Sequence, residues 1–360
     1  NLFTAISKVQ SPALIPLVDF DDEIPDLLKE NSKQINFYFK RNIKFYIKKL
    51  INVFLKKDLD TSYNQKKIYK NFDLTSHSDK IKNKPNIQWI PDFQHIHLPD
   101  MFSKEEYDNR NAEFLKTAEE SDIVILSSED AKKDFEKCFP QYAYKARVLH
   151  FVSYFPNDLY ETTDKLDKQI KEKFNLPEKY FFLPNQFWKH KNHISVFKAV
   201  TLLKKQGINV HIVCTGNTKD YRNPDFFNKL TSFISENNIQ ENIHILGMVD
   251  YKELVYLMRY SIALLQPSLF EGWSSTIEEA KSLGKNCILS NLNVHIEQNP
   301  QDSIYFDPLD IEQISEILSE NYQKLPAGPN LKLEEQAKKN MDKRMLEFGT
   351  TYQKYVLETL

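Results

Sequence analysis

The stretch QPSLFEGWSSTIEEA, Gln266–Ala280, is the part of this chain that indicates the fold most clearly. It follows the apolar segment Ile262–Leu265, which has the composition of a buried strand. A helix is predicted to begin in Ser275–Glu278, where the spacing matches a capping box, with Ser275 as the cap and Glu278 reaching back to it. The N-terminus of a helix exposes unpaired backbone N–H groups, and these attract phosphate.

Two carboxylates flank this predicted helix start, Glu271 before it and Glu279 within it. Carboxylates repel phosphate and suit hydroxyl groups, so the local chemistry suggests a sugar joined to a diphosphate. Glu271 lies in a loop beside a glycine, where a side chain is able to face a ligand. For Glu279 the pattern equally fits one more solvated glutamate on a helix.

Strands and helices alternate along the second half of the chain. The candidate strands are Tyr180–Leu183, Val210–Cys214, Ile243–Leu246, Ile262–Leu265, Asn286–Ser290 and Ser303–Phe306. The helical patterns between them are Ile194–Lys205, Phe226–Glu236, Tyr251–Arg259, Thr276–Leu283 and Ile311–Tyr322. This alternation predicts a parallel sheet with helices on both faces, which binds ligands at the carboxyl ends of its strands.

The first half shows a weaker version of the same pattern. Its candidate strands are Leu14–Asp19, Ile87–Trp89, Ile123–Leu126 and Arg147–Phe151, and its candidate helices are Phe102–Glu119 and Asp130–Cys138. The charged segment Ser153–Lys179 reads as a hinge or linker, and Leu331–Leu360 reads as one long polar helix.

Bulk composition excludes several classes of protein. A chain of 360 residues is comfortable for two domains. Its net charge of −2 gives no global field that would attract nucleic acid. Three widely spaced cysteines form no disulfide framework and no metal-ligand pattern. Since no apolar run approaches the ~18 residues of a membrane span, we expect a cytoplasmic protein, in one possibility peripheral on the inner face of the plasma membrane.

The beginning of the chain is unusual for a domain of this kind. It opens at Asn1 in what reads as the middle of a helix, and every glycine lies at or after Gly207. We therefore expect that a first strand and its glycine-containing turn are missing ahead of Asn1.

A second constellation, LPNQFWKHKNH at Leu183–His193, lies between a predicted strand and a predicted helix. Lys189 and Lys191 bracket the start of that helix, where cations are unfavourable unless an anion lies between them and the N–H groups. A solvated basic loop is the alternative. The cluster is not a metal site, because no carboxylate or thiol stands at ligand spacing.

A third constellation, WIPDFQHIHLP at Trp89–Pro99, places His95 and His97 on one side of an extended chain. The pair resembles half of a zinc site, but without a third ligand this signal is weak. Histidines held in a polar loop and a catalytic histidine fit the pattern equally well.

The basic stretch 37–54 carries apolar residues on one helical stripe, with lysines beside it. A basic amphipathic helix of this kind rests on anionic lipid, or it is an ordinary domain helix with a solvated face. A nucleic-acid site would need phosphate-binding partners elsewhere, and the sequence shows none.

These residues resemble a known family. Glu271 and Glu279 form an E-x7-E spacing, and Lys191-Asn192-His193 and the Gly216 turn lie upstream. Together they look like the retaining glycosyltransferases of family 4, over about residues 180 to 325 and more weakly before that.

The resemblance implies the GT-B fold, in which two Rossmann-like domains with parallel sheets face a central cleft. It implies an acceptor domain at 1–155, a linker at 156–179, a nucleotide-sugar domain at 180–330 and a closing helix at 331–360 that crosses back to the first domain.

The resemblance also assigns roles to residues. Lys191 holds the diphosphate, Glu271 contacts the donor sugar, and Glu279 holds the ribose hydroxyls. Asp92 and His95 serve the acceptor side. The remaining predicted donor contacts are Asn185, Gln186, Lys189, Gly216, Gly272, Trp273, Ser274, Ser275 and Thr276, with the N–H groups of 272–276 facing the phosphates.

Three departures from the family pattern stand out. Gln186 occupies a position where relatives often carry Arg, and Lys189 compensates in our interpretation. Gly272-Trp273-Ser274 replaces a common Gly-Phe-Gly turn, which narrows the freedom of the loop. Pro91-Asp92 replaces a His-Asp pair, so that we assign the role of the usual histidine to His95.

The implied activity is a metal-independent transfer of a hexose, with retention, from a nucleotide-diphosphate sugar to a glycan or lipid-linked acceptor in cell-surface polysaccharide synthesis. No cofactor is expected beyond the donor itself. The alternatives are a GT-B nucleotide-sugar epimerase and a non-catalytic scaffold that binds a sugar nucleotide. The nucleotide base, the sugar, the acceptor and the linkage are not encoded in these motifs.

Overall fold

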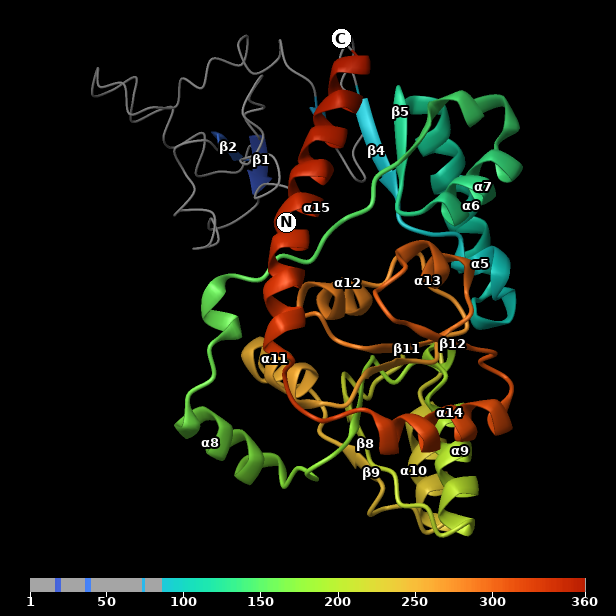
Figure 1. Ribbon diagram of the computed structural model, residues 1–360. Helices are drawn as coiled ribbons and strands as arrows, with labels where there is room; N and C mark the ends of the chain where they lie inside the picture. The colour runs from blue at the N-terminus through green and yellow to red at the C-terminus, as the bar shows by residue number, and fades with distance from the viewer. Residues whose placement is uncertain (1–16, 21–35, 40–72, 75–85, 360) are drawn as a thin grey trace, which may run out of the picture.

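The computed structural model describes residues 17–20, 36–39, 73–74 and 86–359 of the chain. In these residues the protein is an α/β structure built on parallel sheets (Figure 1). The predicted fold class, α/β with parallel sheets, is thereby confirmed.

The larger sheet has six parallel strands in the order β12-β11-β10-β7-β8-β9. In chain order they are β7 (Phe181–Pro184), β8 (Ile212–Thr215), β9 (Ile243–Ile245), β10 (Leu264–Gln266), β11 (Cys287–Ser290) and β12 (Ile304–Phe306). The strands predicted for the second half are confirmed, with small shifts at their ends. Strand order reverses between β7 and β10, and ligands of such sheets bind at this switch point.

The smaller sheet has the parallel order β3-β4-β5-β6. Its strands are β3 (Asp73–Leu74), β4 (Asn86–Ile90), β5 (Ile123–Leu126) and β6 (Ala146–Val148), while β1 (Leu17–Phe20) and β2 (Asn36–Phe39) form a separate parallel pair. The helix predicted over 37–54 is therefore wrong at its start, where three aromatic residues favour a strand. The rest of that stretch, 40–54, lies outside the described residues.

The helices connect these strands and cover the sheets. They are α5 (Gln94–His97), α6 (Lys104–Glu120), α7 (Glu129–Cys138), α8 (Asp164–Phe174), α9 (His193–Lys205), α10 (Phe226–Glu236), α11 (Tyr251–Tyr260), α12 (Ser275–Ser282), α13 (Asn293–Gln298), α14 (Ile311–Lys324) and α15 (Leu331–Glu358). Short 3-10 turns lie at η1 (Pro99–Met101), η2 (Pro140–Lys145), η3 (Asn157–Tyr160) and η4 (Lys189–Lys191).

Alternate residues of β7 show how the larger sheet is covered on both faces. Phe181 and Leu183 pack in a cluster with residues of α9, α10 and α14. Phe182 packs in another cluster, with residues of α11, α12 and α15. Because neighbouring residues of a strand face opposite sides, the apolar run of β7 supplies both layers at once.

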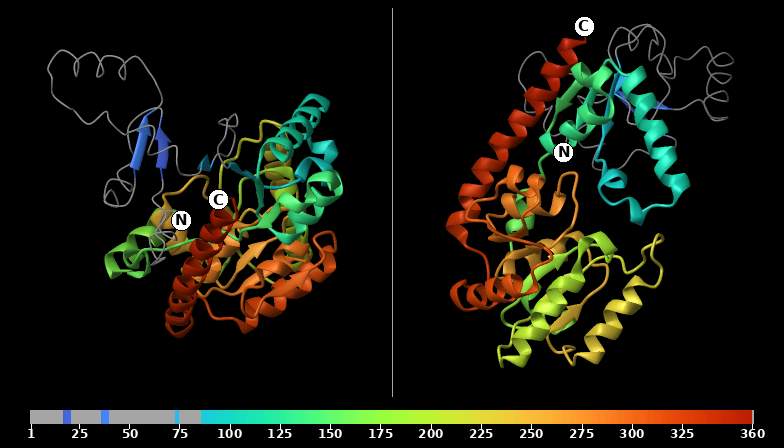
Figure 2. Two further views of the ribbon diagram at one scale, coloured as in Figure 1. Left: turned by 90° about the horizontal axis from the view of Figure 1, so that it is seen from above. Right: turned by 90° about the vertical axis from the view of Figure 1, so that its right-hand side faces the viewer.

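One hydrophobic cluster joins the two sheets. It contains Ile123 and Ile125 of the smaller sheet, Phe182 of the larger sheet and Met345 of α15. Helix α15 runs from the larger sheet past the smaller one (Figure 2). At its far end the Tyr355 hydroxyl donates to the carbonyl of Val148, 2.7 Å away. The domain boundaries at 155, 179 and 330 stay predictions.

Helices α8 and α13 escaped the sequence analysis. Helix α8 lies within the segment 153–179 that reads as a linker; Thr163 caps it and Ile170 is buried. Its ion pairs along the surface, such as Lys171–Asp167 at 2.9 Å, account for the charged composition that concealed it. Helix α13 has only six residues and therefore shows little periodicity.

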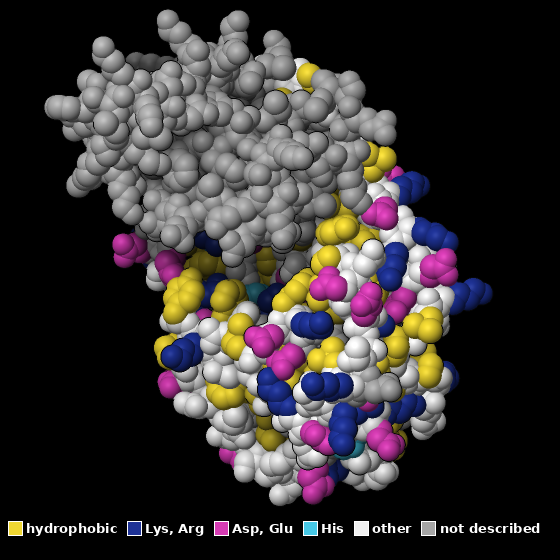
Figure 3. Space-filling view, turned by 90° about the vertical axis from the view of Figure 1, so that its left-hand side faces the viewer, with side chains coloured by type: hydrophobic (Ala, Val, Ile, Leu, Met, Phe, Trp, Pro, Cys, Tyr) yellow, Lys and Arg dark blue, Asp and Glu magenta, His cyan; other side chains and the backbone are white. Residues whose placement is uncertain are grey.

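The described surface mixes charges of both signs. In Figure 3, Lys and Arg side chains are interspersed with Asp and Glu side chains on the face shown. Among the described residues, no helix combines the length and the hydropathy that crossing a bilayer requires.

A buried ion pair fixes the start of α15 to α11. Arg259 Nε lies 2.7 Å from Glu334 Oε1, and Arg259 Nη2 lies 3.0 Å from Glu334 Oε2. The two side chains are 4% and 7% exposed. Arg259 also donates to the Thr162 hydroxyl at 2.7 Å, so the arginine joins three segments that are distant in the sequence.

We predict that Glu334→Ala lowers the free energy of unfolding by about 3–5 kcal/mol, because it leaves the Arg259 guanidinium buried without its counter-charge. Urea denaturation measures the change. The matched control is Glu335→Ala on the same helix, whose exposed partner Lys339 makes an i,i+4 pair; its effect should stay within about 0.5 kcal/mol. Equal effects of the two substitutions would contradict the prediction.

Candidate functional site

The centre of the site is the carboxylate of Glu271. It lies in the α12 turn, residues 267–274, which connects β10 to α12. Glu271 Oε1 accepts hydrogen bonds from Lys191 Nζ at 2.6 Å, Ser268 Oγ at 2.7 Å and Gln266 Nε2 at 2.9 Å. Burial raises the pKa of Glu271, but the Lys191 charge and these donors outweigh burial and hold the pKa below its usual value.

Lys191 approaches this carboxylate from the neighbouring strand. It ends the 3-10 turn η4, which follows β7. The two loops are joined by the Leu269 N–H, which donates to the carbonyl of His190 at 2.8 Å, and by Asn192 Nδ2, which donates to the carbonyl of Pro267 at 3.1 Å. The structure therefore brings the predicted lysine and the predicted turn together at the switch point between β7 and β10.

Two of the other predicted residues after β7, Asn185 and Gln186, make contacts within the protein. Asn185 is buried, and its Nδ2 donates to Gln266 Oε1 at 2.6 Å. Gln186 Oε1 accepts from the Asn217 N–H at 2.7 Å. Lys189 is exposed. A Cβ on Gly216, whose φ is 140°, would lie 2.3 Å from the carbonyl oxygen of Asn185, so only glycine allows these two strand ends to approach.

The start of α12 differs from the prediction by one residue. Ser274, rather than Ser275, is the N-cap, and its hydroxyl accepts from the Ile277 N–H at 3.4 Å. The predicted capping box is wrong for a physical reason: Glu278 does not reach back to the cap. It is buried and paired with Lys281, at 2.9 Å, and with Arg344 of α15.

Glu279 is partly buried on the next turn of α12. The Tyr251 hydroxyl, at the start of α11, lies 3.4 Å from Glu279 Oε1. Burial raises the pKa of Glu279 to about 7, and the hydrogen bond from Tyr251 opposes this only in part. The carboxyl is therefore poised to change its charge near neutral pH.

The smaller sheet contributes Asp92. Asp92 Oδ1 accepts from the Gln94 N–H at 2.9 Å and pairs with Arg110 Nη2 at 3.0 Å. A Cβ placed on Gly272 would lie 2.7 Å from Asp92 Cβ and 2.6 Å from the carbonyl oxygen of Pro91. The α12 turn thus touches the backbone after β4, and glycine at 272 permits this contact.

The predicted histidines lie in α5 and not in an extended chain, so the alternation expected for them is wrong. His95 is 0% exposed and bonds Asn111 Oδ1 at 3.1 Å, among aromatic rings. Burial lowers the pKa of His95. His97 instead pairs with Asp134 at 2.7 Å, and its ring lies 5.2 Å from that of Phe270 in the α12 turn. The structure brings Asp92 to the turn and encloses His95.

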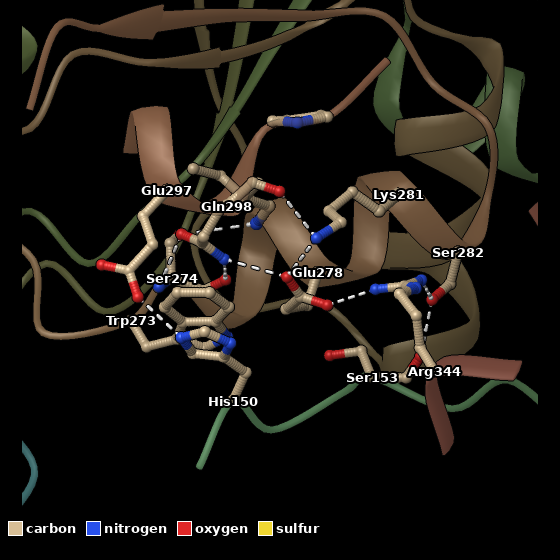
Figure 4. A network of polar contacts seen from close by, with 12 residues as sticks. His150, Ser153, Trp273, Ser274, Glu278, Lys281, Ser282, Glu297, Gln298 and Arg344 are labelled. Carbon is tan, nitrogen blue, oxygen red and sulfur yellow. Dashed lines mark hydrogen bonds and ion pairs between the residues drawn. The ribbon is translucent and has the colours of Figure 1, made fainter. Parts of the chain in front are cut away.

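Helix α13, beside the turn, contacts residues that follow β5 and β6 of the smaller sheet. Glu297 Oε1 accepts from the Glu129 N–H at the start of α7, at 2.8 Å. It also accepts from His150 Nε2 at 2.6 Å (Figure 4). The His150 ring stacks on Trp273, with 4.3 Å between ring centres and 6° between planes. The smaller sheet and the α12 turn therefore share one set of contacts.

Sequence reasoning missed Arg222, which lies in the loop after β8. Its guanidinium packs on Phe102 and Trp188, 5.2 and 5.1 Å from the ring centres, and Nη1 lies 3.3 Å from Gln94 Oε1. The one available signal was the position of this arginine in a polar loop after a strand. Gln298 and Arg344 gave no signal, since their partners are distant in the sequence. Among the described residues, no group of three or more His, Cys, Asp or Glu side chains is arranged to hold a metal ion.

Known proteins are similar to this chain in sequence and in structure. The O-antigen chain mannosyltransferase RfbU of Salmonella typhimurium is 28% identical over 169 residues, which are 47% of this chain and 44% of that protein. The match thus spans less than half the length of that curated relative. Among solved structures, HepE of Anabaena, in complex with UDP and glucose, has a TM-score of 0.65 at 15% identity and is covered over 95% of its length by the whole of this chain.

A glycosyltransferase from Rickettsia africae has the same TM-score of 0.65, at 16% identity, with coverage of 100% of this chain and 94% of that one. At such low identity these structures establish the fold alone, which is GT-B. The family model described as Glycosyl transferases group 1 matches residues 164–343, half of the chain. On this match the chain belongs to the glycosyl transferases group 1 family.

Proposed function

We propose that this protein is a retaining glycosyltransferase of family 4 that moves a hexose from a nucleotide-diphosphate sugar to a glycan or lipid-linked acceptor. One observation carries the proposal: Lys191 meets the α12 turn at the switch point of the larger sheet, where it pairs with Glu271 of that turn. A cation and free N–H groups suit the diphosphate, and a carboxylate beside them suits sugar hydroxyls.

The diphosphate would lie at the N-terminus of α12. Ser275 and Thr276 are the first residues of this helix, so no preceding turn accepts their N–H groups. The Ser274 N–H donates to Gln298 Oε1 at 3.1 Å and is occupied. The donor would take over Lys191 as a phosphate contact and would offer hydroxyl groups to Glu271, while Glu279 would accept from the ribose.

Bond cleavage places negative charge on the departing diphosphate. N–H groups at a helix start and a lysine stabilise such charge, and we propose that the reaction needs no metal for this reason. Retention would follow from attack on the same face of the sugar, with the leaving phosphate taking the acceptor's proton. Asp92, which adjoins Gly272, is the better placed of the two predicted acceptor-side residues, because His95 is enclosed.

The comparisons support the proposed substrates. RfbU is named as a mannosyltransferase of O-antigen chains, and the structure of HepE holds UDP and glucose. A hexose donor and a role in cell-surface polysaccharide synthesis are in line with both. Cytoplasmic placement and peripheral membrane contact stay predictions.

The deciding experiment incubates the protein with UDP-glucose and, separately, GDP-mannose. We expect nucleoside diphosphate to be released from one of them and its release to increase when a glycan or lipid-linked sugar is added. Conversion of the donor into another nucleotide sugar would identify an epimerase. Binding in a thermal-shift screen of UDP, GDP and ADP, without any turnover, would identify a non-catalytic scaffold.

For Lys191→Ala we predict about 10- to 150-fold weaker binding of the nucleoside diphosphate, because a charge-assisted contact is worth about 1.5–3 kcal/mol. Turnover should fall as well. Isothermal titration measures the affinity, and thermal unfolding checks that the variant is folded. Lys198→Ala is the matched control, since this exposed lysine of α9 carries the same charge away from the site. Equal affinities of wild type and Lys191→Ala would remove the phosphate role.

A second prediction concerns pH and Glu279. Because the pKa of Glu279 is raised to about 7, its carboxyl is neutral below that value and accepts poorly from ribose hydroxyls. We expect the affinity for the nucleotide sugar to rise as pH increases through 7, and Glu279→Gln to lose this dependence. A nucleotide sugar is the right probe, since its diphosphate has no group that titrates in this range. Identical pH profiles of the two proteins would refute the assignment.

A further inference from the structure

We propose that Gln298, the last residue of α13, is a positioning residue for the α12 turn in the transfer reaction. Its side chain is 2% exposed. Oε1 accepts from the Ser274 N–H at 3.1 Å, and Nε2 donates to the Ser274 carbonyl at 3.0 Å. One amide therefore holds both backbone groups of the residue that caps α12, as a neighbouring strand would.

The orientation of this amide is set by Glu278. Gln298 Nε2 lies 3.2 Å from Glu278 Oε1. A carboxylate that is paired with cations offers only acceptors, so the NH2 group of Gln298 must face it and the carbonyl oxygen must face the Ser274 N–H. Lys281 Nζ donates to Glu278 Oε1 at 2.9 Å and to the main-chain carbonyl of Gln298 at 2.7 Å, while Arg344 binds the other carboxylate oxygen of Glu278 (Figure 4).

This arrangement selects which N–H groups reach a ligand. Gln298 occupies the Ser274 N–H and fixes the peptide planes on both sides of that residue. The N–H groups of the next two residues, Ser275 and Thr276, then have no acceptor within the helix and face the solvent side of its N-terminus. These are the groups that the proposed function assigns to the diphosphate, so the inference rests on that function.

The neighbour of Gln298 connects this device to the smaller sheet. Glu297 binds the start of α7 and His150, and His150 stacks on Trp273. Two consecutive residues of α13 thus hold the turn from one side and the smaller sheet from the other. The short helix that sequence analysis missed sets the position of the turn relative to both sheets.

Two substitutions separate positioning from simple structural support. Gln298→Leu keeps the volume and removes all three hydrogen bonds of the side chain. Gln298→Glu keeps the shape, but its ionised form has no donor for the Ser274 carbonyl and meets the Glu278 carboxylate. When the carboxyl introduced at position 298 is protonated, it again offers one donor and one acceptor to Ser274. Gln353→Leu, at another buried glutamine on α15, is the matched control.

The measurement is the affinity for UDP, GDP and ADP, each titrated at several pH values. The temperature of the titrations lies below the unfolding temperature of every variant. We expect Gln298→Leu to bind the nucleotide preferred by the wild type about 10- to 100-fold more weakly, because misplaced N–H groups lose charge-assisted hydrogen bonds to the diphosphate, and Gln353→Leu to bind it normally. Gln298→Glu should bind weakly at pH 8 and recover towards pH 5. Dividing its affinity by that of the wild type at the same pH removes the effect of the nucleotide's own ionisation. Amide exchange over 270–282 should accelerate in Gln298→Leu.

The outcomes separate the two proposals. If the wild type binds a nucleotide and both Gln298 variants bind it equally well at all pH values, the positioning role is wrong while the proposed function stands. If the wild type binds none of the three, the proposed function fails and this inference fails with it. Should Gln298→Leu not fold, the pH dependence of Gln298→Glu still decides, since a purely structural role would alter its unfolding temperature without altering its relative affinity.

Discussion

The ion pair between Lys191 and Glu271 stands at the switch point of the larger sheet, with both side chains largely removed from solvent. Burying two charges is costly unless their remaining hydrogen-bonding groups are satisfied. The surrounding residues meet this demand, since Gln266 and Ser268 donate to Glu271 and Asn185 in turn donates to Gln266. A donor would replace each partner by one of matching character, phosphate for the lysine and hydroxyl for the carboxylate.

Segments that are distant in the sequence hold this centre in place. The α12 turn donates hydrogen bonds to Gln298 of α13 and to the Phe151 carbonyl after β6, and Arg344 of α15 pairs with Glu278 in the first turn of α12. Gly272 meets the backbone of Pro91 so closely that a Cβ would collide with its oxygen. The turn is therefore shaped from several sides at once, and its geometry is a property of the assembled molecule and not of its local sequence.

The limits of prediction from the sequence follow from the same distinction. The parallel sheet and the meeting of Lys191 with the α12 turn were accessible, because short apolar strands and the polar loops that follow them are local signals. The sequence predicts Ser275 as the cap because its spacing from Glu278 matches a capping box, whereas the cap is Ser274, whose N–H bonds Gln298, 24 residues further along. His95 was expected in an extended loop, and its helix α5 is only four residues long. Glu297, Arg344 and Arg222 act across the sheets, where no local pattern points to them.

The stacking of Trp273 on His150 has a practical consequence. The chain contains three tryptophans. Trp273 lies in the α12 turn, where its ring stacks on His150 and its Nε1 donates to the carbonyl of Phe151, after β6. An imidazole in face-to-face contact with an indole quenches its emission, most strongly when the imidazole is protonated. Intrinsic fluorescence at this position therefore reports, in the unlabelled protein, whether the α12 turn is in contact with the segment after β6.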